Sequence, residues 1–323
     1  MNEQPTLRHL VVPLDGSRLA EQAIPFAQAL VDLAGKITLL QVVPDPEPIH
    51  GLLGKQIATP AEVRAAYEQA ASQYLNGAVK LVAAGVIAEP HIAVGDPEEQ
   101  ILYFAATESV DLIVMASHGR GAVGRWMFGS VADKVARAST VPVLIVHPPD
   151  AEAPPAAVTL RRVVAPLDGS ELAAEALPVA AVYAKRLGVP VHLVQAVDLA
   201  ALLPSVTPGP VPGLAVTGEV YDKMIDELQS QAEKTLREGA DQLAQAGVAV
   251  TTKVTIGPAI AVISEATGPG DVLVLTSHGR GGFTRWLMGS VAERLIRTGA
   301  VPVVLVPAST RIAAMGNGTL VRG

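Results

Sequence analysis

Cysteine is absent from the 323 residues of the chain. This absence excludes disulfide bonds, thiol nucleophiles, and zinc or iron–sulfur sites with cysteine ligands. Aromatic residues are scarce, at 3% of the chain, so the hydrophobic half of the sequence consists mostly of Ala, Val, Leu and Ile. Short runs of such aliphatic residues are typical of strands that are buried on both faces of a parallel sheet.

Charged residues are also few, at 17%, with 24 Lys and Arg against 31 Asp and Glu, and the formal net charge is −7. The basic residues form no cluster, although a protein that binds duplex nucleic acid needs one to neutralise phosphates. We therefore expect a globular protein with a substantial core and no nucleic-acid partner.

No hydrophobic run approaches the roughly 18 residues that a membrane-spanning helix needs. The first residues, MNEQPTLRHLVVPLDG, also lack the basic segment and the apolar stretch of a signal peptide. The sequence thus predicts a soluble cytoplasmic protein without a membrane partner.

The sequence contains an internal duplication. RHLVVPLDGS at 8–17 returns as RRVVAPLDGS at 161–170, and SHGRG at 117–121 returns at 277–281. Residues 116–146 and 276–306 align without gaps at 16 identities in 31 positions. A duplication of this kind indicates a repeated fold and suggests, without proving, a repeated site.

A segment rich in proline separates the two copies. HPPDAEAPPAAVTL at 147–160 has four prolines and mostly small residues, as semi-rigid linkers do. We expect a first domain at 1–147, a linker at 148–160, a second domain at 161–307 and a flexible tail at 308–323.

Within each copy, aliphatic runs of strand length alternate with stretches of helical periodicity. In the first copy, strands are indicated by LVVPL, ITLLQVV, HIAV, DLIVMA and VPVLIV, and helices at about 18–33, 60–84, 97–107 and 130–138. The second copy repeats the strands as RVVAPL, VHLVQAV, VTTKVTI, DVLVLT and VPVVLV. This alternation predicts two tandem α/β domains, each a doubly wound parallel sheet with helices on both faces.

Ligands of such sheets bind beyond the carboxyl ends of the strands. Glycine-containing segments leave those ends in both copies, namely DGS at 15–17 and 168–170, and SHGRG at 117–121 and 277–281. Asp15 and Asp168 have two readings here, as caps of the following helix or as contacts to a ligand.

A Gly-Ser pair begins the last predicted helix of each copy, at Gly129-Ser130 and Gly289-Ser290. A glycine loop that leads into a helix start can hold phosphate, because it offers unpaired backbone N–H groups and the positive end of the helix dipole. Each serine hydroxyl either caps its helix as an ordinary N-cap or donates to a phosphate oxygen.

The spacing G-x2-G-x9-G-[ST] after the fourth strand, together with PLDGS after the first, resembles the universal stress protein family. The resemblance covers both copies, essentially all of 8–147 and 161–307. It implies an adenine-nucleotide-type, Rossmann-like fold with a five-stranded parallel sheet in the order 3-2-1-4-5. It also implies ATP as the ligand and a role in the stress response.

Carried over by position, the resemblance implies one nucleotide site in each copy. The adenosine side is formed by Pro13, Asp15 and Val42 in the first copy, and by Pro166, Asp168 and Ala196 in the second. The ribose side is lined by Met115 and Ala116, and by Leu275 and Thr276. The phosphate side consists of Gly119, Arg120, Gly129, Ser130 and Val131, and of Gly279, Arg280, Gly289, Ser290 and Val291.

Two positions depart from the family motif, because Ala116 and Thr276 stand where its first glycine is expected. The branched Thr276 leaves less room for a ribose than Ala116 does. The family also includes members that bind no nucleotide. Two functions therefore stay open: an ATP-binding stress-response module, and a nucleotide-free interaction scaffold of the same fold.

No catalytic residue is predicted. His118 and His278 have no acid–base partner or nucleophile at a fixed spacing. No residue is identifiable as a base that orients an attacking water, so we expect slow ATP hydrolysis at most. We also expect no metal site built by the protein; Mg²⁺ would be carried by the phosphates of ATP.

Each copy ends in an aliphatic strand, VPVLIV at 141–146 and VPVVLV at 301–306, which the family resemblance places at a sheet edge. Proteins normally cover such edges, and single-domain relatives cover them by dimerising across these strands. The 14 residues of 147–160 reach about 45 Å at 3.3 Å per residue, far enough for the two edges to meet. We expect an intramolecular pseudo-dimer of the two domains, and association into a homo-oligomer through other surfaces stays open.

Overall fold

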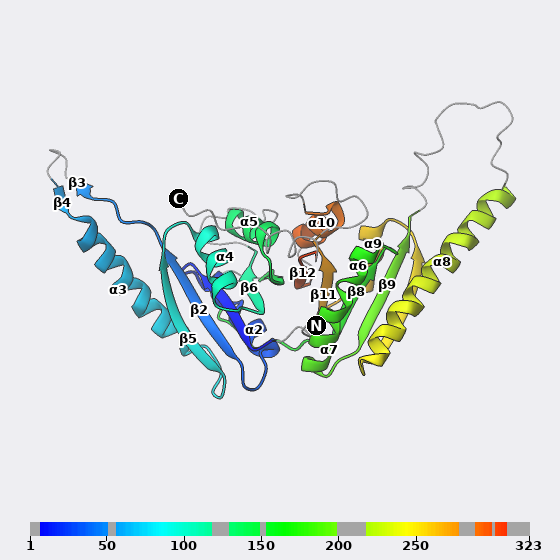
Figure 1. Cartoon of the computed structure of the whole chain (residues 1–323), viewed down its shortest axis with the longest axis horizontal. Helices are drawn as coiled ribbons and strands as arrows, with labels where there is room; N and C mark the ends of the chain where they lie inside the picture. The colour runs from blue at the N-terminus through cyan, green and yellow to red at the C-terminus, as the bar shows by residue number, and fades with distance from the viewer. Residues whose placement is uncertain are drawn as a thin grey trace, which may run out of the picture. The chain divides into compact units, whose positions relative to one another are not determined.

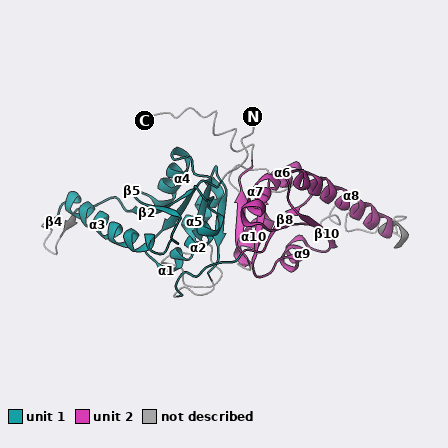
Figure 2. Cartoon of the chain, turned by 90° about the horizontal axis from the view of Figure 1, so that it is seen from below, with its two compact units in different colours: residues 1–159, 314–323 teal, residues 160–313 magenta. Residues whose placement is uncertain are grey.

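The computed structural model describes residues 7–50, 56–117, 129–148, 153–198, 218–277, 288–298 and 301–308. The chain divides into two compact units, Met1–Thr159 with Ala314–Gly323, and Leu160–Ala313 (Figure 2). We call them unit 1 and unit 2. The boundary between the units lies at the end of the proline-rich segment, and the predicted domain limits stay a prediction.

Unit 1 contains seven strands and five helices among its described residues (Figure 1). In chain order they are β1 (His9–Leu14), α1 (Arg18–Glu21), α2 (Ile24–Leu30), β2 (Lys36–Val43), β3 (Ile49–His50), β4 (Gln56–Ala58), α3 (Pro60–Val79), β5 (Ile87–Val94), α4 (Pro97–Thr107), β6 (Leu112–Ala116), α5 (Ser130–Ala138) and β7 (Val143–Val146). Five of the strands pair in parallel in the order β5-β2-β1-β6-β7, and β3 and β4 form a separate antiparallel pair.

Unit 2 repeats this architecture. Its elements are β8 (Arg162–Leu167), α6 (Glu171–Ala174), α7 (Leu177–Leu187), β9 (Val191–Val197), α8 (Gly218–Gln245), β10 (Val250–Ile256), α9 (Ala259–Ala266), β11 (Asp271–Thr276), α10 (Ser290–Thr298) and β12 (Val303–Val306). The strands pair in parallel in the order β10-β9-β8-β11-β12. In each unit this is the order 3-2-1-4-5, which confirms the predicted fold.

The core of each unit lies on both faces of its central strands. Every residue of β6, β7, β11 and β12 is buried, as their unbroken aliphatic sequences predict. Helices cover both faces of each sheet (Figure 1). On one face of unit 2, α8 packs so closely that a Cβ atom built on Gly239 would lie 3.1 Å from Leu167 Cδ1 and 3.2 Å from Leu193 Cδ1.

Three predicted elements differ in the structure. The helix expected at about 60–84 ends earlier, at Val79. The helix expected at 18–33 is two helices, α1 and α2, because Pro25 lacks the N–H that a continuous helix needs and instead stands in the first turn of α2. The strand expected at HIAV begins four residues earlier, at Ile87, and contains Pro90. Proline is tolerated there because β5 pairs only with β2 among the described strands of unit 1.

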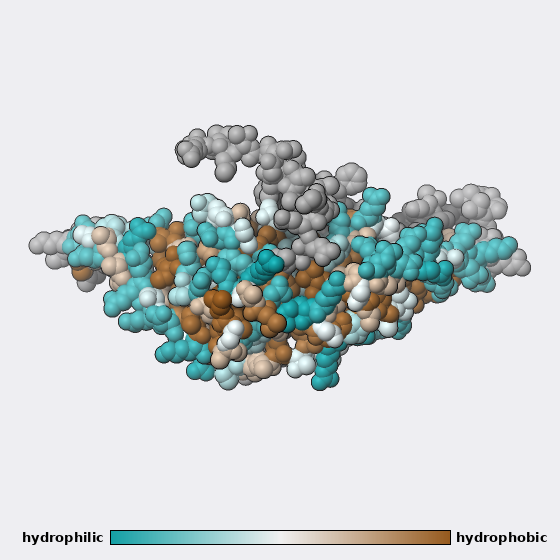
Figure 3. Space-filling model, turned by 60° about the horizontal axis from the view of Figure 1, so that its bottom comes forward, coloured by the Kyte–Doolittle hydropathy of each residue, from teal (hydrophilic) through white to brown (hydrophobic). Residues whose placement is uncertain are grey.

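In the view of Figure 3, patches of hydrophobic residues lie among hydrophilic ones. Large apolar side chains are exposed on both units: Leu33, Ile57, Tyr67, Leu81, Ile87, Tyr103 and Ile256. Among the described residues, no helix combines the length and the apolar character that crossing a membrane requires. The cytoplasmic location stays a prediction.

Candidate functional site

The candidate site of unit 1 lies at the carboxyl ends of β1 and β6. These strands are neighbours, with Val11 of β1 beside Ile113 of β6, although four other strands separate them in the sequence. On its other side β1 pairs with β2. The strand order therefore reverses between β1 and β6, because the chain continues from β1 to β2 on one side and returns to β6 on the other. Open α/β sheets bind their ligands at such a point. β8, β11 and β9 repeat the arrangement in unit 2.

Asp15 and its equivalent Asp168 each close a tight turn at the end of the first strand. Oδ1 of Asp15 accepts hydrogen bonds from the backbone N of Ser17 at 2.9 Å and from Ser17 Oγ at 2.6 Å. Gly16 between them has φ 83°, a left-handed conformation that favours glycine. The turn of Asp168, Gly169 and Ser170 has the same two distances.

The helix cap in each turn is the serine, not the aspartate. Ser17 Oγ accepts from the backbone N of Ala20 at 3.1 Å, and Ser170 Oγ accepts from Ala173 at 3.1 Å. The reading of Asp15 and Asp168 as helix caps is therefore wrong. The aspartates orient the capping serines, and their carboxylates stay at the candidate site.

The start of α5 is held by backbone contacts. Gly129 is the N-cap of α5 and makes no side-chain cap hydrogen bond, while its N–H donates to the carbonyl of Ser117 at 2.7 Å. Gly289 donates to the carbonyl of Ser277 at 2.8 Å in unit 2. Each helix start is thus fixed directly beside the end of the fourth strand.

Ser130 is the first residue of α5 and is exposed, so the reading of this serine as an N-cap is wrong. Because no side chain of the described residues caps α5, the N–H groups of its first turn have the capacity to bind an anion. Ser290 is likewise the first residue of α10 and is exposed.

The remaining predicted residues divide by burial. Met115 and Ala116, and Leu275 and Thr276 in unit 2, are at most 7% exposed at the ends of β6 and β11. The half-buried residues are Pro13, Val42, Val131, Pro166, Ala196 and Val291. The residues Gly119, Arg120, Gly279, Arg280, His118 and His278 lie outside the described part of the chain.

An ion pair that the sequence analysis missed links α5 to its neighbour. Lys134 of α5 pairs with Glu98 in the first turn of α4. The start of α4 is capped by Asp96, whose Oδ1 accepts from the backbone N of Glu98 at 3.1 Å and of Glu99 at 3.4 Å. Gly-Asp-Pro at 95–97 was a recognisable cap signal, whereas the ion pair spans two helices and has no signal in the sequence.

Unit 2 differs from unit 1 at this helix start. Pro258 is the N-cap of α9 and makes no side-chain cap hydrogen bond, and Ile260 stands at the position of Glu98. The two candidate sites therefore share their turns and glycine contacts, but unit 2 has neither the aspartate cap nor a residue that could form the ion pair between the adjacent helices. Within the described residues, no group of three or more His, Asp or Glu side chains has the arrangement of a metal site.

Comparison with known proteins agrees with this architecture. The sequence profile of the universal stress protein family matches residues 6–147 and again residues 159–307. A universal stress protein of Mycolicibacterium smegmatis is 28% identical over 304 residues, covering 92% of this chain and 96% of its own. A shorter one from Thermus aquaticus is 34% identical over 144 residues, 43% of this chain and 97% of its own.

Solved structures show the same fold. The crystal structure of a universal stress protein from Archaeoglobus fulgidus superposes with a TM-score of 0.62 at 22% identity, covering 93% of this chain and 98% of that one. Two matches to the family profile together span both units, each with the sheet order that the family resemblance predicted. The chain therefore belongs to the universal stress protein family, as a member with two family domains in tandem.

Proposed function

We propose that the protein binds ATP at the carboxyl edge of each unit and acts in the stress response through this binding. The observation that carries the proposal is a repeated pairing of two features. An Asp-Gly-Ser turn leaves the first strand, and a glycine-led helix start lies beside the end of the neighbouring fourth strand. Family membership supports the proposal but does not decide it.

The described residues fit the chemical groups of ATP. The half-buried aliphatic side chains of Val42 and Ala196 suit an adenine ring, and the Asp15 carboxylate is an acceptor for hydroxyl or amino groups. The start of α5, with no side-chain cap, suits phosphate oxygens because backbone N–H groups and the helix dipole both favour an anion. Bound ATP would bring a triphosphate for this helix start to hold, and it would carry any Mg²⁺.

A nucleotide-free scaffold is the second candidate, and one observation favours it in unit 2. Thr276 ends β11 at the position that Ala116 has in unit 1, and both residues are buried, so the larger, branched side chain of Thr276 leaves less room for a ribose. We therefore propose unit 1 as the tighter nucleotide site. The proposal includes no catalytic residue.

The nucleotide content of the purified full-length protein tests the proposal. Protein prepared without added ligand is denatured in acid, and the released nucleotides are separated and quantified. We expect ATP or its hydrolysis product ADP to be released from the wild type and to be depleted in the double variant Gly129→Asp/Gly289→Asp. Wild-type protein that releases no nucleotide, and that gives no heat on titration with ATP, would support the scaffold instead.

A further inference from the structure

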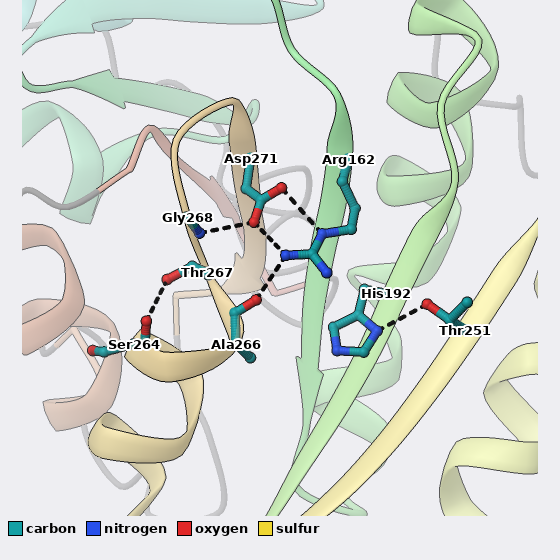
Figure 4. A network of polar contacts seen from close by, with 8 residues as sticks. All are labelled: Arg162, His192, Thr251, Ser264, Ala266, Thr267, Gly268 and Asp271. Carbon is teal, nitrogen blue, oxygen red and sulfur yellow. Dashed lines mark hydrogen bonds and ion pairs between the residues drawn. The ribbon is translucent and has the colours of Figure 1, made fainter.

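In each unit a side chain of the first strand binds the carboxyl end of a helix, α4 in unit 1 and α9 in unit 2, but the residue differs between the units. α4 and α9 run from the carboxyl edge of their sheets back to the amino-terminal edge. In unit 1, Nδ1 of His9 donates to the carbonyl of Glu108, the residue that follows α4, at 2.8 Å. In unit 2, Arg162 stands at the position of His9, and its Nη2 donates to the carbonyl of Ala266, the last residue of α9, at 2.9 Å (Figure 4).

The contact in unit 2 is made by a permanent cation. Arg162 is bound to the carboxylate of Asp271, from Nη2 to Oδ2 at 2.6 Å and from Nε to Oδ1 at 3.1 Å (Figure 4). The hydrogen bond to Asp271 raises the pKa of Arg162 above its already high ordinary value. The hydrogen bond from Arg162 to the end of α9 therefore does not depend on pH in the physiological range.

The contact in unit 1 is made by a group that titrates in that range. His9 is 7% exposed, and its Nε2 accepts a hydrogen bond from Thr38 Oγ1 at 2.9 Å. The ring of Phe104 in α4 packs edge-on against the His9 ring, with 6.0 Å between the ring centroids. His91 of β5 contacts the same Phe104 ring at 4.7 Å. The His9 ring is thus enclosed by β1, β2 and α4 with one hydrogen bond at each nitrogen.

Burial lowers the pKa of His9 below its ordinary value of 6.5, and the charge of Lys36 lowers it further. The hydrogen bond to Glu108 and the carboxylates of Asp111 and Glu89 oppose this shift. A depressed pKa means that the folded state binds the proton less readily than the unfolded state. The stability that neutral His9 contributes is therefore complete above about pH 6.5 and is lost as the pH falls below that value. Burial is the largest cause of the shift, so the charged ring is stabilised when α4 moves away from it and water enters the pocket. The bond from Nδ1–H to the Glu108 carbonyl, which the charged ring keeps, opposes this opening but does not outweigh the effect of burial.

α4 connects His9 to the candidate phosphate site. The same helix that His9 holds at its carboxyl end carries Glu98 in its first turn, and Glu98 pairs with Lys134 of α5. α5 begins at Ser130, directly after Gly129. In unit 2 α9 and α10 are also in contact, but the equivalent ion pair cannot form, because Ile260 at the position of Glu98 has no charge.

We propose that acid loosens α4 through His9 and thereby weakens nucleotide binding in unit 1, while unit 2, held by Arg162, is affected less. This regulation rests on the proposed function, because it acts on the same nucleotide site.

His192 of unit 2 does not provide an equivalent route. Burial, and next the charge of Arg162, lower the pKa of His192; Lys253 acts in the same direction, and Asp271 opposes it. Its Nδ1 contacts Thr251 Oγ1 of β10 at 2.9 Å (Figure 4), so it joins two strands and does not hold α9. Protonation of His192 weakens unit 2 as a whole but leaves the bond from Arg162 to Ala266 in place.

Amide hydrogen exchange of the ligand-free full chain tests the helix contact without any nucleotide. Protection factors, corrected for the intrinsic effect of pH, are compared at about pH 7.5 and about pH 5.5, on either side of the ordinary histidine pKa. We expect protection in α4 to fall in acid by a larger factor than protection in α9. His9→Gln, whose amide keeps a donor and an acceptor but does not titrate, should reduce this fall, and the control His192→Gln should leave it unchanged.

Equal losses of protection in α4 and α9, or an unchanged loss in His9→Gln, would overturn the proposed contact. If His9→Gln does not fold, the comparison of α4 with α9 is made in His192→Gln, in which this histidine no longer weakens unit 2 in acid, and it still decides the question.

ATP titrations at the same two pH values test the regulation. The full chain with Gly289→Asp reports unit 1, and the full chain with Gly129→Asp reports unit 2. We expect the affinity of unit 1 to fall in acid by a larger factor than that of unit 2, and Glu98→Gln to make the two factors more alike. If the wild type binds no ATP at about pH 7.5, the proposed function fails while the exchange result still stands. If ATP binds but both units respond equally to acid, only the regulation fails.

Discussion

Arg162 binds Asp271 through two of its nitrogen atoms, at 2.6 Å and 3.1 Å, and this pair fixes the start of β11 to β8. Asp271 is 5% exposed and also accepts from the backbone N of Gly268 at 2.9 Å. Asp111 holds the same position in unit 1 but accepts from two backbone groups, those of Arg8 at 2.7 Å and His9 at 3.0 Å. The same carboxylate position thus binds a side-chain cation and a main-chain donor in unit 2, and two main-chain donors at the start of the first strand in unit 1.

Arg162→Met should destabilise unit 2 by about 2 kcal/mol, because it leaves the buried Asp271 carboxylate without its charged donor. Chemical denaturation of the full chain measures the free energy of unfolding. Arg297→Met is the control, since Arg297 pairs with Glu293 on the surface of α10 and such pairs contribute only about 0.5 kcal/mol. Equal losses in the two variants would contradict the assigned role of Arg162.

Gly129→Asp should remove the tighter ATP site, and Gly289→Asp the weaker one. Aspartate is a good N-cap and Gly129 has φ −62°, so the variant keeps its helix start but places a negative charge where phosphate is proposed to bind. Gly129→Asn is the matched control, because asparagine caps the helix equally well without the charge. Calorimetric titration of the two variants with ATP shows which unit binds ATP more tightly. If Gly129→Asp keeps most of the affinity and Gly289→Asp loses it, unit 2 is the tighter site and the prediction is wrong.

Ser130→Ala should weaken ATP binding by about 1 kcal/mol, as expected for one lost hydrogen bond, and should leave stability nearly unchanged. The stability is unaffected because Gly129, and not Ser130, is the N-cap of α5. Ser17→Ala should instead lower the free energy of unfolding by about 1 kcal/mol, since Ser17 caps α1. A loss of stability in Ser130→Ala without a change in affinity would assign Ser130 a structural role.

The double variant Val143→Pro/Val303→Pro tests the intramolecular pseudo-dimer. These valines begin β7 and β12, and proline removes a strand donor from each. We expect small-angle scattering to show separated domains or aggregation, whereas Val143→Thr/Val303→Thr, which keeps the backbone donors, should remain docked. Domains that stay docked in the proline variant would refute the pseudo-dimer.

The sequence predicted strands at all ten positions of the two parallel sheets because most of these strands are short aliphatic runs, and the family resemblance supplied their order. It did not predict β3 and β4, which are short and contain no such run. It also predicted the turn at Asp15 and the helix start at Gly129, since glycine and aspartate mark turns by their own chemistry. Their role as ligand contacts stays a prediction. It did not predict which group caps each helix, because Asp15 and Ser17 are both good caps and only the backbone conformation selects the serine.

The contacts at the amino-terminal edges were not predictable from the sequence. His9 meets Glu108 across 99 positions, and Arg162 meets Asp271 across 109. No periodicity or motif records a pairing over such a separation. Aligning the two copies places His9 opposite Arg162, but only the structure shows that both hold the end of a helix.

Calorimetric titration of the full-length wild type with ATP and with adenosine tests the central claim most directly. We expect the protein to bind ATP with much higher affinity than adenosine, because the helix starts recognise phosphate. The double variant Gly129→Asp/Gly289→Asp should abolish this difference in affinity. Equal affinity for ATP and adenosine, or no binding of ATP, would contradict it.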